Sequence, residues 1–449
     1  MDEIKLETMS VSGGMPAPIL GKRTPFAATR AELLALLPLY VLGYLYLHTL
    51  SHELPTQTLW LLPFTLLFVA VTEMVYWGKP RLRENWFWLG CLGLTLLGML
   101  LHPAHVRIID LGETIYEPGG LVWSTAHAFL YLHVFAVWYV LSRGGRFLEG
   151  ESGRLLPADA LNGFVIIPFR HFFLRIRTLW FGLTRLGWRK GKPRTETAIW
   201  TAAAALAALG LFCQAAKLLM AADAQFAALL SDLRIPWEKL QNVTIEDVLS
   251  LPVGAYLFGL IAGSAREDPS RLRGRGQALV QTLETLRKVP NFIWLLLGGA
   301  FCLLYLVFFA VQSRYLFGAF TRTLPEGFIV SQYARQGFFE LCQVMTVNFV
   351  LLWLLTRMSA IPVRQHKGAW LVCVLLLAES LLFALIAASK LWLYIDNFGI
   401  TQLRLQSCWG ICVLTAGCLC TLWSLCTGRQ SLRACLAFSA GSAALLCLF

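Results

Sequence analysis

Residues 292–312 read FIWLLLGGAFCLLYLVFFAVQ, a stretch without a charged side chain. A helix needs about 20 apolar residues to cross roughly 30 Å of hydrocarbon, at about 1.5 Å per residue. The stretch lacks the alternation of apolar and polar residues that a barrel strand requires, and lipid cannot satisfy the open edge of a sheet. Residues 292–312 therefore predict a membrane-spanning helix.

The composition of the whole chain agrees with this prediction. Of its 449 residues, 57% are hydrophobic and 14% are charged, whereas soluble domains carry about 25% charged residues. We expect about eleven spans, within a range of ten to twelve, because further apolar segments follow the same pattern. These segments cover residues 33–51, 57–77, 86–102, 122–142, 198–219, 250–265, 291–313, 339–357, 369–389, 403–427 and 431–449. The predicted fold class is an all-α, polytopic integral membrane protein.

The charges predict how the chain is oriented and divided. If the spans alternate, 29 of the 38 Lys and Arg residues fall on the same side as the N-terminus. Basic residues concentrate in cytoplasmic segments, so we expect a cytoplasmic N-terminus. The expected parts are a tail (1–31), a four-helix membrane region (32–142), a cytoplasmic connector (143–197) and a C-terminal membrane domain (198–449). The basic segments lack any nucleic-acid-binding motif, and no nucleic acid is expected as a partner.

The connector contains the segment 168–192, PFRHFFLRIRTLWFGLTRLGWRKGK. On a helical wheel its Arg residues and His171 fall mostly on one side, and Phe, Ile, Leu and Trp fall mostly on the other. This pattern predicts a basic amphipathic helix that lies on the bilayer and contacts anionic lipids of the inner leaflet. The helix could be a lipid sensor, or an elbow that only anchors the fold.

Several histidines and cysteines are candidate ligands of a metal or haem. His48 and His52 share a helix face at i, i+4, and His102 and His105 follow a predicted span on the same side. No HExxH or CxxC motif occurs, and the 12 cysteines lie in or beside apolar segments. Interfacial histidines and buried thiols are therefore the favoured interpretation, and we expect no cofactor.

Two polar side chains fall near the middle of predicted spans, Glu379 in 369–389 and Asn348 in 339–357. Ionisable groups at this depth are costly and often functional. Glu379 could be a protonatable carboxyl in a transport path. It could also be a protonated acid hydrogen bonded to Asn348, which would join two helices.

The densest polar clustering lies on the predicted outer side of the last third of the chain. The cluster, called the outer cluster below, consists of Arg314, Tyr315, Tyr333, Arg335, Glu340, Tyr394, Asp396, Asn397 and Arg404. Arg404 is placed to pair with Asp396 or Glu340, and residues 396–399 are typical of a turn. Such a cluster could hold an anionic or polar ligand. It could equally be an ion-pair network that locks helix ends together.

The same region resembles a known family. The segments RYLFGAF (314–320), LPEG…YARQGFFEL (324–341) and YIDNFGITQLRL (394–405) resemble the signature blocks of a bacterial multi-pass membrane family of unknown function, the 4153/4173 domain-of-unknown-function group. The resemblance covers residues 310–410. It implies a polytopic protein of the bacterial cytoplasmic membrane, with no established activity and no catalytic residues.

Three function classes follow from these observations. The favoured one is a non-enzymatic sensor, assembly or accessory protein that uses the outer cluster to bind a ligand or a membrane-protein partner. The first alternative is a transporter or translocation component that uses Glu379, and the second is a metal- or haem-binding membrane enzyme. An enzyme is the least favoured, because the sequence contains no complete catalytic motif.

Overall fold

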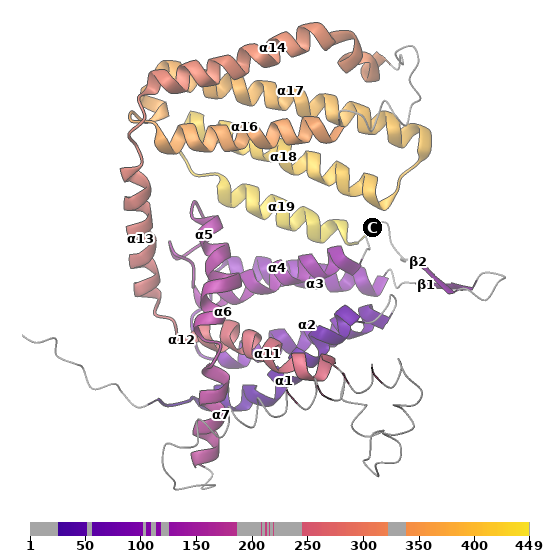
Figure 1. Cartoon of the computed structure of the whole chain (residues 1–449), viewed down its shortest axis with the longest axis vertical. Coiled ribbons are helices and arrows are strands. Elements are labelled where there is room, and N and C mark those ends of the chain that lie inside the picture. The colour runs from indigo at the N-terminus through magenta and orange to yellow at the C-terminus, as the bar shows by residue number, and fades with distance from the viewer. Residues whose placement is uncertain are drawn as a thin grey trace, which may run out of the picture.

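The computed structural model describes residues 26–51, 56–101, 105–108, 114–117, 125–185, 245–321 and 338–448, together with residues 208, 212, 215 and 219. In this part of the chain the fold is helical apart from one antiparallel hairpin, β1 (His105–Ile108) with β2 (Thr114–Glu117). The all-α prediction is confirmed. The helices that run side by side form two bundles, stacked one above the other in Figure 1.

The first bundle shares one hydrophobic core. It contains α1 (Arg30–Ser51), α2 (Thr56–Val75), α3 (Glu84–Leu101), α4 (Thr125–Gly144), α11 (Ile245–Phe258) and α19 (Leu432–Leu446). The π-helical turn η2 (Gly259–Gly263) continues α11 into α12 (Ser264–Arg266). Helices α11 and α19 pack on the N-terminal helices. The first hydrophobic core therefore contains residues from both sides of the expected boundary at residue 198.

Glycines allow α1 and α11 to pack closely. A Cβ atom on Gly43 would lie 2.4 Å from the carbonyl oxygen of Ser250, and one on Gly254 would lie 2.9 Å from that of Leu39. Real Cβ atoms do not approach a carbonyl oxygen to 2.4 Å, so only glycine fits at residue 43 without a shift of the backbone. The pairing of residue 43 with 250 and of 39 with 254 makes the two helices antiparallel.

The second bundle contains α14 (Asn291–Thr321), α16 (Phe338–Met358), α17 (Lys367–Phe398) and α18 (Gln402–Thr427). Its central helix is α17, which contacts each of the other three. The side chains of Leu376, Phe383 and Ile386 are almost completely buried against those neighbours. The second bundle meets the first through α18, which contacts α19.

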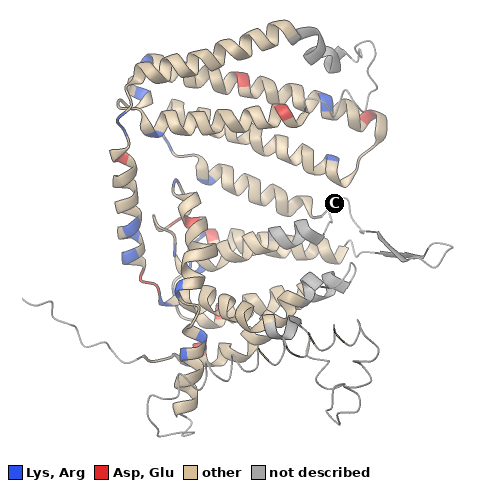
Figure 2. Cartoon of the chain, in the orientation of Figure 1, with Lys and Arg blue, Asp and Glu red and all other residues tan. Residues whose placement is uncertain are grey.

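A set of helices runs across one end of both bundles (Figure 1). These helices are α5 (Leu156–Leu161), η1 (Asn162–Ile166), α6 (Ile167–Arg170), α7 (Leu174–Arg185) and α13 (Pro269–Thr285). We call this end the inner face. Lys and Arg residues gather mainly along it, as the blue segments in Figure 2 show.

Segments that the sequence placed on the cytoplasmic side meet at the inner face. The contacts that join them include Glu84 with Arg433 and Ser152, Lys79 with Ala265, Glu32 with Arg266, and Val289 with Met358. Alternating spans would place all these segments on one side of a bilayer.

The number of spans differs from the expectation. Seven helices in the part described are long and apolar enough to cross a membrane, and the apolar segments Leu61–Val75 and Leu432–Leu446 are shorter. The expected span 198–219 lies outside the described residues, apart from four isolated positions. On these criteria the chain is a multi-pass helical protein, with fewer qualifying spans than the eleven expected.

The expected continuous helix over 168–192 is divided. Helix α6 ends at Arg170 and α7 begins at Leu174, with a turn between them, and residues 186–192 lie outside the described part. In the turn, His171 packs directly against Gly263. A Cβ atom added to Gly263 would lie 2.5 Å from the Cβ atom of His171. The break lets α6 pack on η2 while α7 packs on α1 and α11, which a single straight helix could not do.

Candidate functional site

Arg404 of the outer cluster caps a helix end. Its guanidinium donates hydrogen bonds to the carbonyl oxygens of Phe398 and Gly399, and it covers the ring of Tyr394 at 4.0 Å from the ring centre. Helix α17 ends here, because Gly399 has a φ of +74°. A cation at a helix C-terminus stabilises both the last carbonyls and the helix dipole. This part of the outer cluster therefore locks the end of α17 to the start of α18.

The rest of the outer cluster is only partly described. Glu340, Asp396 and Asn397 are exposed, and the Asn397 side chain donates to the carbonyl oxygen of Leu393. Tyr333 and Arg335 lie outside the described residues, as do the side chains of Arg314 and Tyr315. A ligand site in the outer cluster stays a prediction.

A row of hydrogen bonds crosses the middle of the second bundle. The Tyr305 hydroxyl donates to Asn348 Oδ1 at 2.7 Å, Asn348 Nδ2 donates to Ser380 Oγ at 2.9 Å, and Ser380 Oγ donates to the carbonyl oxygen of Leu376. This polar row joins α14, α16 and α17. Asn348 was predicted from the sequence as a polar residue at mid-span. Tyr305 and Ser380 were not, although each carries a hydroxyl group inside a predicted span.

Glu379 lies beside the polar row. Its side chain is buried, and Oε2 has no hydrogen-bond partner in the part of the chain that is described. The thiol of Cys302 on α14 is a hydrogen-bonding neighbour of the Glu379 carboxyl group. Asn348 bonds Ser380, the residue next to Glu379 along the chain.

The histidines gather no metal site in the described residues, which contain no group of three potential metal ligands. His52 and His102 lie outside that part, and so do the side chains of His48 and His105. The metal and haem hypothesis is therefore untested at these positions.

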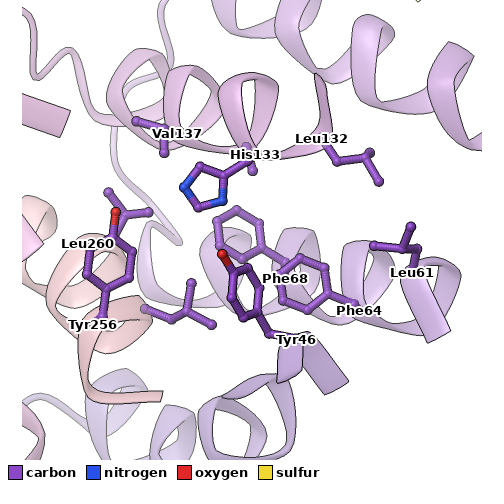
Figure 3. A pocket seen from close by; sticks show the side chains of 11 residues that line it. Tyr46, Leu61, Phe64, Phe68, Leu132, His133, Val137, Tyr256 and Leu260 are labelled. Carbon is purple, nitrogen blue, oxygen red and sulfur yellow. The ribbon is translucent and has the colours of Figure 1, made fainter. Parts of the chain in front are cut away.

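His133 lines a small cavity inside the first bundle. Figure 3 shows its ring facing Tyr46, with Tyr256 on the adjacent wall. The ring also stacks on Phe164 at 5.5 Å between ring centres. The cavity has a volume of about 20 Å³, which is room for about one water molecule. It is too small for a haem or a lipid chain.

The inner face carries a larger cavity, of about 380 Å³, which we call the basic cavity. It is lined by Arg170, His171, Arg266, Glu267, Asp268, Arg271 and Arg275. These residues come from the end of α6 and the turn after it, the end of α12, and the first turns of α13. The lining has four arginines against two carboxylates.

Local sequence explains how α13 presents its arginines. Asp268 caps the helix by accepting a hydrogen bond from the Ser270 backbone N–H at 2.9 Å, and Pro269 takes the first helical position, where its missing N–H costs nothing. Arg271 and Arg275 are four residues apart and therefore share a helix face. Leu272, on another face of the helix, is fully buried.

Glu267 of the lining, and Glu32 outside it, neutralise two of the four arginines of the basic cavity. Glu267 Oε1 accepts from Arg170 Nη1 at 2.9 Å and contacts His171 Nε2 at 3.1 Å. Burial alone would raise the pKa of Glu267, but these two neighbours hold it below its usual value. Arg266 pairs with Glu32 through two nitrogens, at 2.5 and 2.6 Å.

The other arginines of the basic cavity face solvent. The Arg271 side chain is 82% exposed and lies 4.0 Å from Asp268, a distance at which an exposed pair contributes little. Arg275 is also exposed. Burial lowers the pKa of nearby Lys79, and the charges of Arg146, Arg143 and Arg266 lower it further, while Glu32 opposes them. The local field is therefore positive and favours an anion.

The basic cavity was not predicted from the sequence. The helix start at Asp268-Pro269-Ser270 and the i, i+4 arginines are readable in the sequence. The contact between residues 170 and 267 is not, because it depends on how α6 packs on η2.

The fold defines a multi-pass helical membrane protein with an ionic inner face. The family model described as "Domain of unknown function (DUF4153)" matches residues 118–449, and the chain belongs to this family. The match extends well beyond residues 310–410, where the sequence resemblance lay, and it includes helices of both bundles. Searches of curated proteins and of solved structures found no match.

Proposed function

We propose that this chain is a non-enzymatic sensor, assembly or accessory protein that binds phosphate-bearing anionic headgroups in the basic cavity. The observation that carries the proposal is the meeting of four arginines from three segments around an open cavity, with Arg271 and Arg275 facing solvent. Arginine matches phosphate geometry through paired N–H donors. Basic pockets at the cytoplasmic ends of spans are suited to anionic lipids.

The proposal places the inner face in the cytoplasm of a bacterium, on the cytoplasmic membrane, with about eleven spans. Its support is the meeting of the basic segments at one end of the bundles. Arg185 lies at that end, whereas α11 begins at the opposite end, since Glu32 near the start of α1 contacts Arg266 at the end of α12. Arg185 and the start of α11 therefore lie at opposite ends of the first bundle, as the alternation of spans in this proposal expects.

Helices α6 and α7 are suited to hold the basic cavity at the bilayer surface. Phe169, Phe173 and Leu179 expose 59%, 49% and 43% of their surface. Exposed Arg170 and Arg177 lie beside these apolar side chains. Apolar groups flanked by arginines fit the boundary between headgroups and acyl chains. A headgroup at that depth would reach the cavity without leaving the membrane.

The proposal is tested by thermal unfolding of the purified full chain in detergent, with added phosphatidylglycerol, phosphatidylcholine or inorganic phosphate. A ligand that binds only the folded state raises the unfolding midpoint by mass action. We expect phosphatidylglycerol to raise it more than phosphatidylcholine. An equal rise with inorganic phosphate would identify the ligand as a free anion rather than a lipid.

Matched variants test whether the effect belongs to the basic cavity. Arg275→Gln should remove at least half of the phosphatidylglycerol shift. Arg273→Gln is the control, because Arg273 is exposed on the same helix but lies near Gly150 instead of lining the cavity. Equal losses in the two variants would mean that general surface charge, and not the cavity, attracts the lipid.

A transporter remains the second candidate, favoured by one observation: a buried glutamate with an unpartnered oxygen in the middle of the second bundle. It requires a path for the substrate to Glu379. Labelling of cysteines placed along α17 with a charged maleimide would reveal such a path. A block of unreactive positions on both sides of residue 379 would rule it out.

A further inference from the structure

Glu379 carries a carboxyl group that is buried in the second bundle. Glu379 is 8% exposed. Among the described residues it forms no ion pair, and its Oε2 accepts no hydrogen bond. Lys390, a buried cation on the same helix, lies eleven residues further on, which is about 16 Å along the axis. That distance is too long for a direct pair.

The neighbouring polar groups do not compensate a negative charge. The hydroxyl of Tyr305 donates to Asn348, and that of Ser380 donates to the carbonyl oxygen of Leu376, so both hydroxyl protons are committed elsewhere. The Cys302 thiol, which does interact with Glu379, is a weak donor. The polar row therefore holds the three helices together beside Glu379 without solvating it.

Among the residues that the structure describes, the elements around Glu379 contribute no cation at this depth. Helix α14 contributes Cys302 and Tyr305, α16 contributes Asn348, and α17 itself contributes Cys373 and Ser380 to the surrounding core. Helix α18 adds the buried thiol of Cys418 to the same core. None of these groups carries a positive charge.

We propose that Glu379 is a proton-binding site of the second bundle, and that its ligand is the proton itself. An isolated carboxylate is very costly in an apolar interior, and a bound proton removes that cost. The inference does not rest on the basic cavity, and its failure would leave the anion proposal standing. It requires no transport path. It requires only that the Glu379 carboxyl group is protonated in the folded protein.

The first bundle supplies a matched control. Glu73 also lies in an apolar helix, but Arg143 Nε contacts its Oε2 at 3.0 Å and Arg81 Nη2 contacts it at 2.5 Å. Two arginines stabilise the carboxylate form. The two glutamates should therefore differ in protonation in the same protein under the same conditions.

The first experiment uses dicyclohexylcarbodiimide, an apolar reagent for carboxylic acids. The acid O–H adds across one C=N bond, and acyl migration to nitrogen leaves a stable N-acylurea. The protein gains the mass of one reagent molecule and releases nothing. Peptide mass spectrometry should find the adduct on Glu379 and not on Glu73, with labelling that falls as the pH rises. It should be lost in Glu379→Gln and retained in Glu73→Gln.

Sodium chloride at constant pH separates a proton site from a cation site. Labelling of Glu379 should be the same with sodium chloride as with choline chloride at equal ionic strength. Protection by sodium would overturn the proposal, since the resident ligand would then be a metal cation.

Infrared difference spectroscopy supplies a measurement that needs no access for a reagent. The spectrum of the wild type minus that of Glu379→Gln, both as folded protein at neutral pH, should contain a carboxylic-acid carbonyl band. A carboxylate band in its place would overturn the proposal, whatever the labelling result. Glu379→Gln keeps the size of the side chain, and monodisperse elution would check that the variant is folded.

Discussion

The two bundles treat a glutamate within an apolar helix in opposite ways. In the first bundle, Glu73 near the end of α2 receives Arg143 and Arg81 together with the hydroxyl of Tyr139. In the second bundle, Glu379 lies in the middle of α17, where the neighbouring hydrogen bonds are between uncharged groups. A glutamate near a helix end can reach an arginine of the following loop, here Arg81, and one at the end of a neighbouring helix, here Arg143, whereas Glu379 at mid-depth has no such neighbour among the described residues.

The difference divides the work of stabilisation between the two bundles. Arg143 also donates to the carbonyl oxygens of Tyr76 and Lys79, so one buried guanidinium joins α4 to the end of α2 and to the following loop. The first bundle therefore depends on a charge network near the inner face. The second depends on apolar packing and on the polar row.

The largest effect is expected from breaking the charge network in the first bundle. Arg143→Met should lower the free energy of unfolding by about 3–5 kcal/mol, because it removes a buried cation from a partly buried carboxylate. Thermal unfolding and the yield of folded protein would measure it. Arg83→Met is the control, since Arg83 is exposed. If both variants lowered the free energy of unfolding by the same small amount, the charge network would not stabilise the first bundle. The two bundles would then not differ in what stabilises them.

The next effect concerns α19, through which α18 of the second bundle meets the first. A Cβ atom on Gly98 would lie 2.0 Å from the backbone carbonyl oxygen of Cys447, a contact that forces the backbone to move. Gly98→Ala should therefore lower the free energy of unfolding by about 2–3 kcal/mol, measured by the thermal midpoint.

Gly93 on the same helix provides the control for this prediction. Nothing lies within 4 Å of a Cβ atom there. Gly93→Ala should be neutral or slightly stabilising, because alanine favours helix by up to about 1 kcal/mol. Similar behaviour of the two variants would mean that α19 is not held against the first bundle by this contact.

Much of the fold was readable from the sequence because apolar runs report helices directly. The expected spans 339–357 and 403–427 lie within a residue or two of α16 and α18. Helix α17 continues to Phe398, nine residues beyond the expected span 369–389, because its last turns contain polar residues that hydropathy excludes. The predicted turn 396–399 is wrong for its first three residues, which belong to the last turn of α17, and the chain leaves the helix only at Gly399.

The candidate sites were less predictable, since they depend on which helices meet. Asn348 could be singled out as a polar residue at mid-span, but its bond to Tyr305 requires the packing of α16 on α14. The basic cavity joins residue 170 to residue 267. Nothing in either local segment encodes that register, because the close approach at Gly263 that permits it is a tertiary feature.

A smaller effect would separate the two glutamates by stability alone. Glu73→Gln should lower the free energy of unfolding by about 1–3 kcal/mol, because it leaves buried Arg143 without its counter-charge. Glu379→Gln should change it by less than about 0.5 kcal/mol, since a neutral amide replaces a neutral acid. Thermal midpoints at pH 7 in one detergent would compare them. A loss at Glu379 as large as that at Glu73 would indicate an ionic partner and would end the contrast.

The smallest effect is a pH dependence at the inner face, where Asp159 of α5 is 1% exposed. Burial raises the pKa of Asp159 to about 7, against a partial lowering by the Leu148 backbone N–H that donates to Oδ1, and the charges of Glu149 and Glu84 raise it further. The folded state then binds this proton more tightly than the unfolded state. The free energy of unfolding should fall as the pH rises from about 4 to about 7.

Asp159→Asn should remove this dependence, because asparagine keeps an acceptor for Leu148 and never ionises. Relative to the wild type, the variant should gain stability steadily up to about pH 7, so that its advantage at pH 8 exceeds its advantage at pH 5 by on the order of 1–3 kcal/mol. Thermal midpoints between pH 5 and 8 would measure it, with Glu284→Gln on exposed α13 as the control. Parallel pH curves for wild type and Asp159→Asn would mean that Asp159 is charged in the fold. The inner face would then hold a buried carboxylate without an arginine partner, and the rule that separates Glu73 from Glu379 would not extend to this part of the molecule.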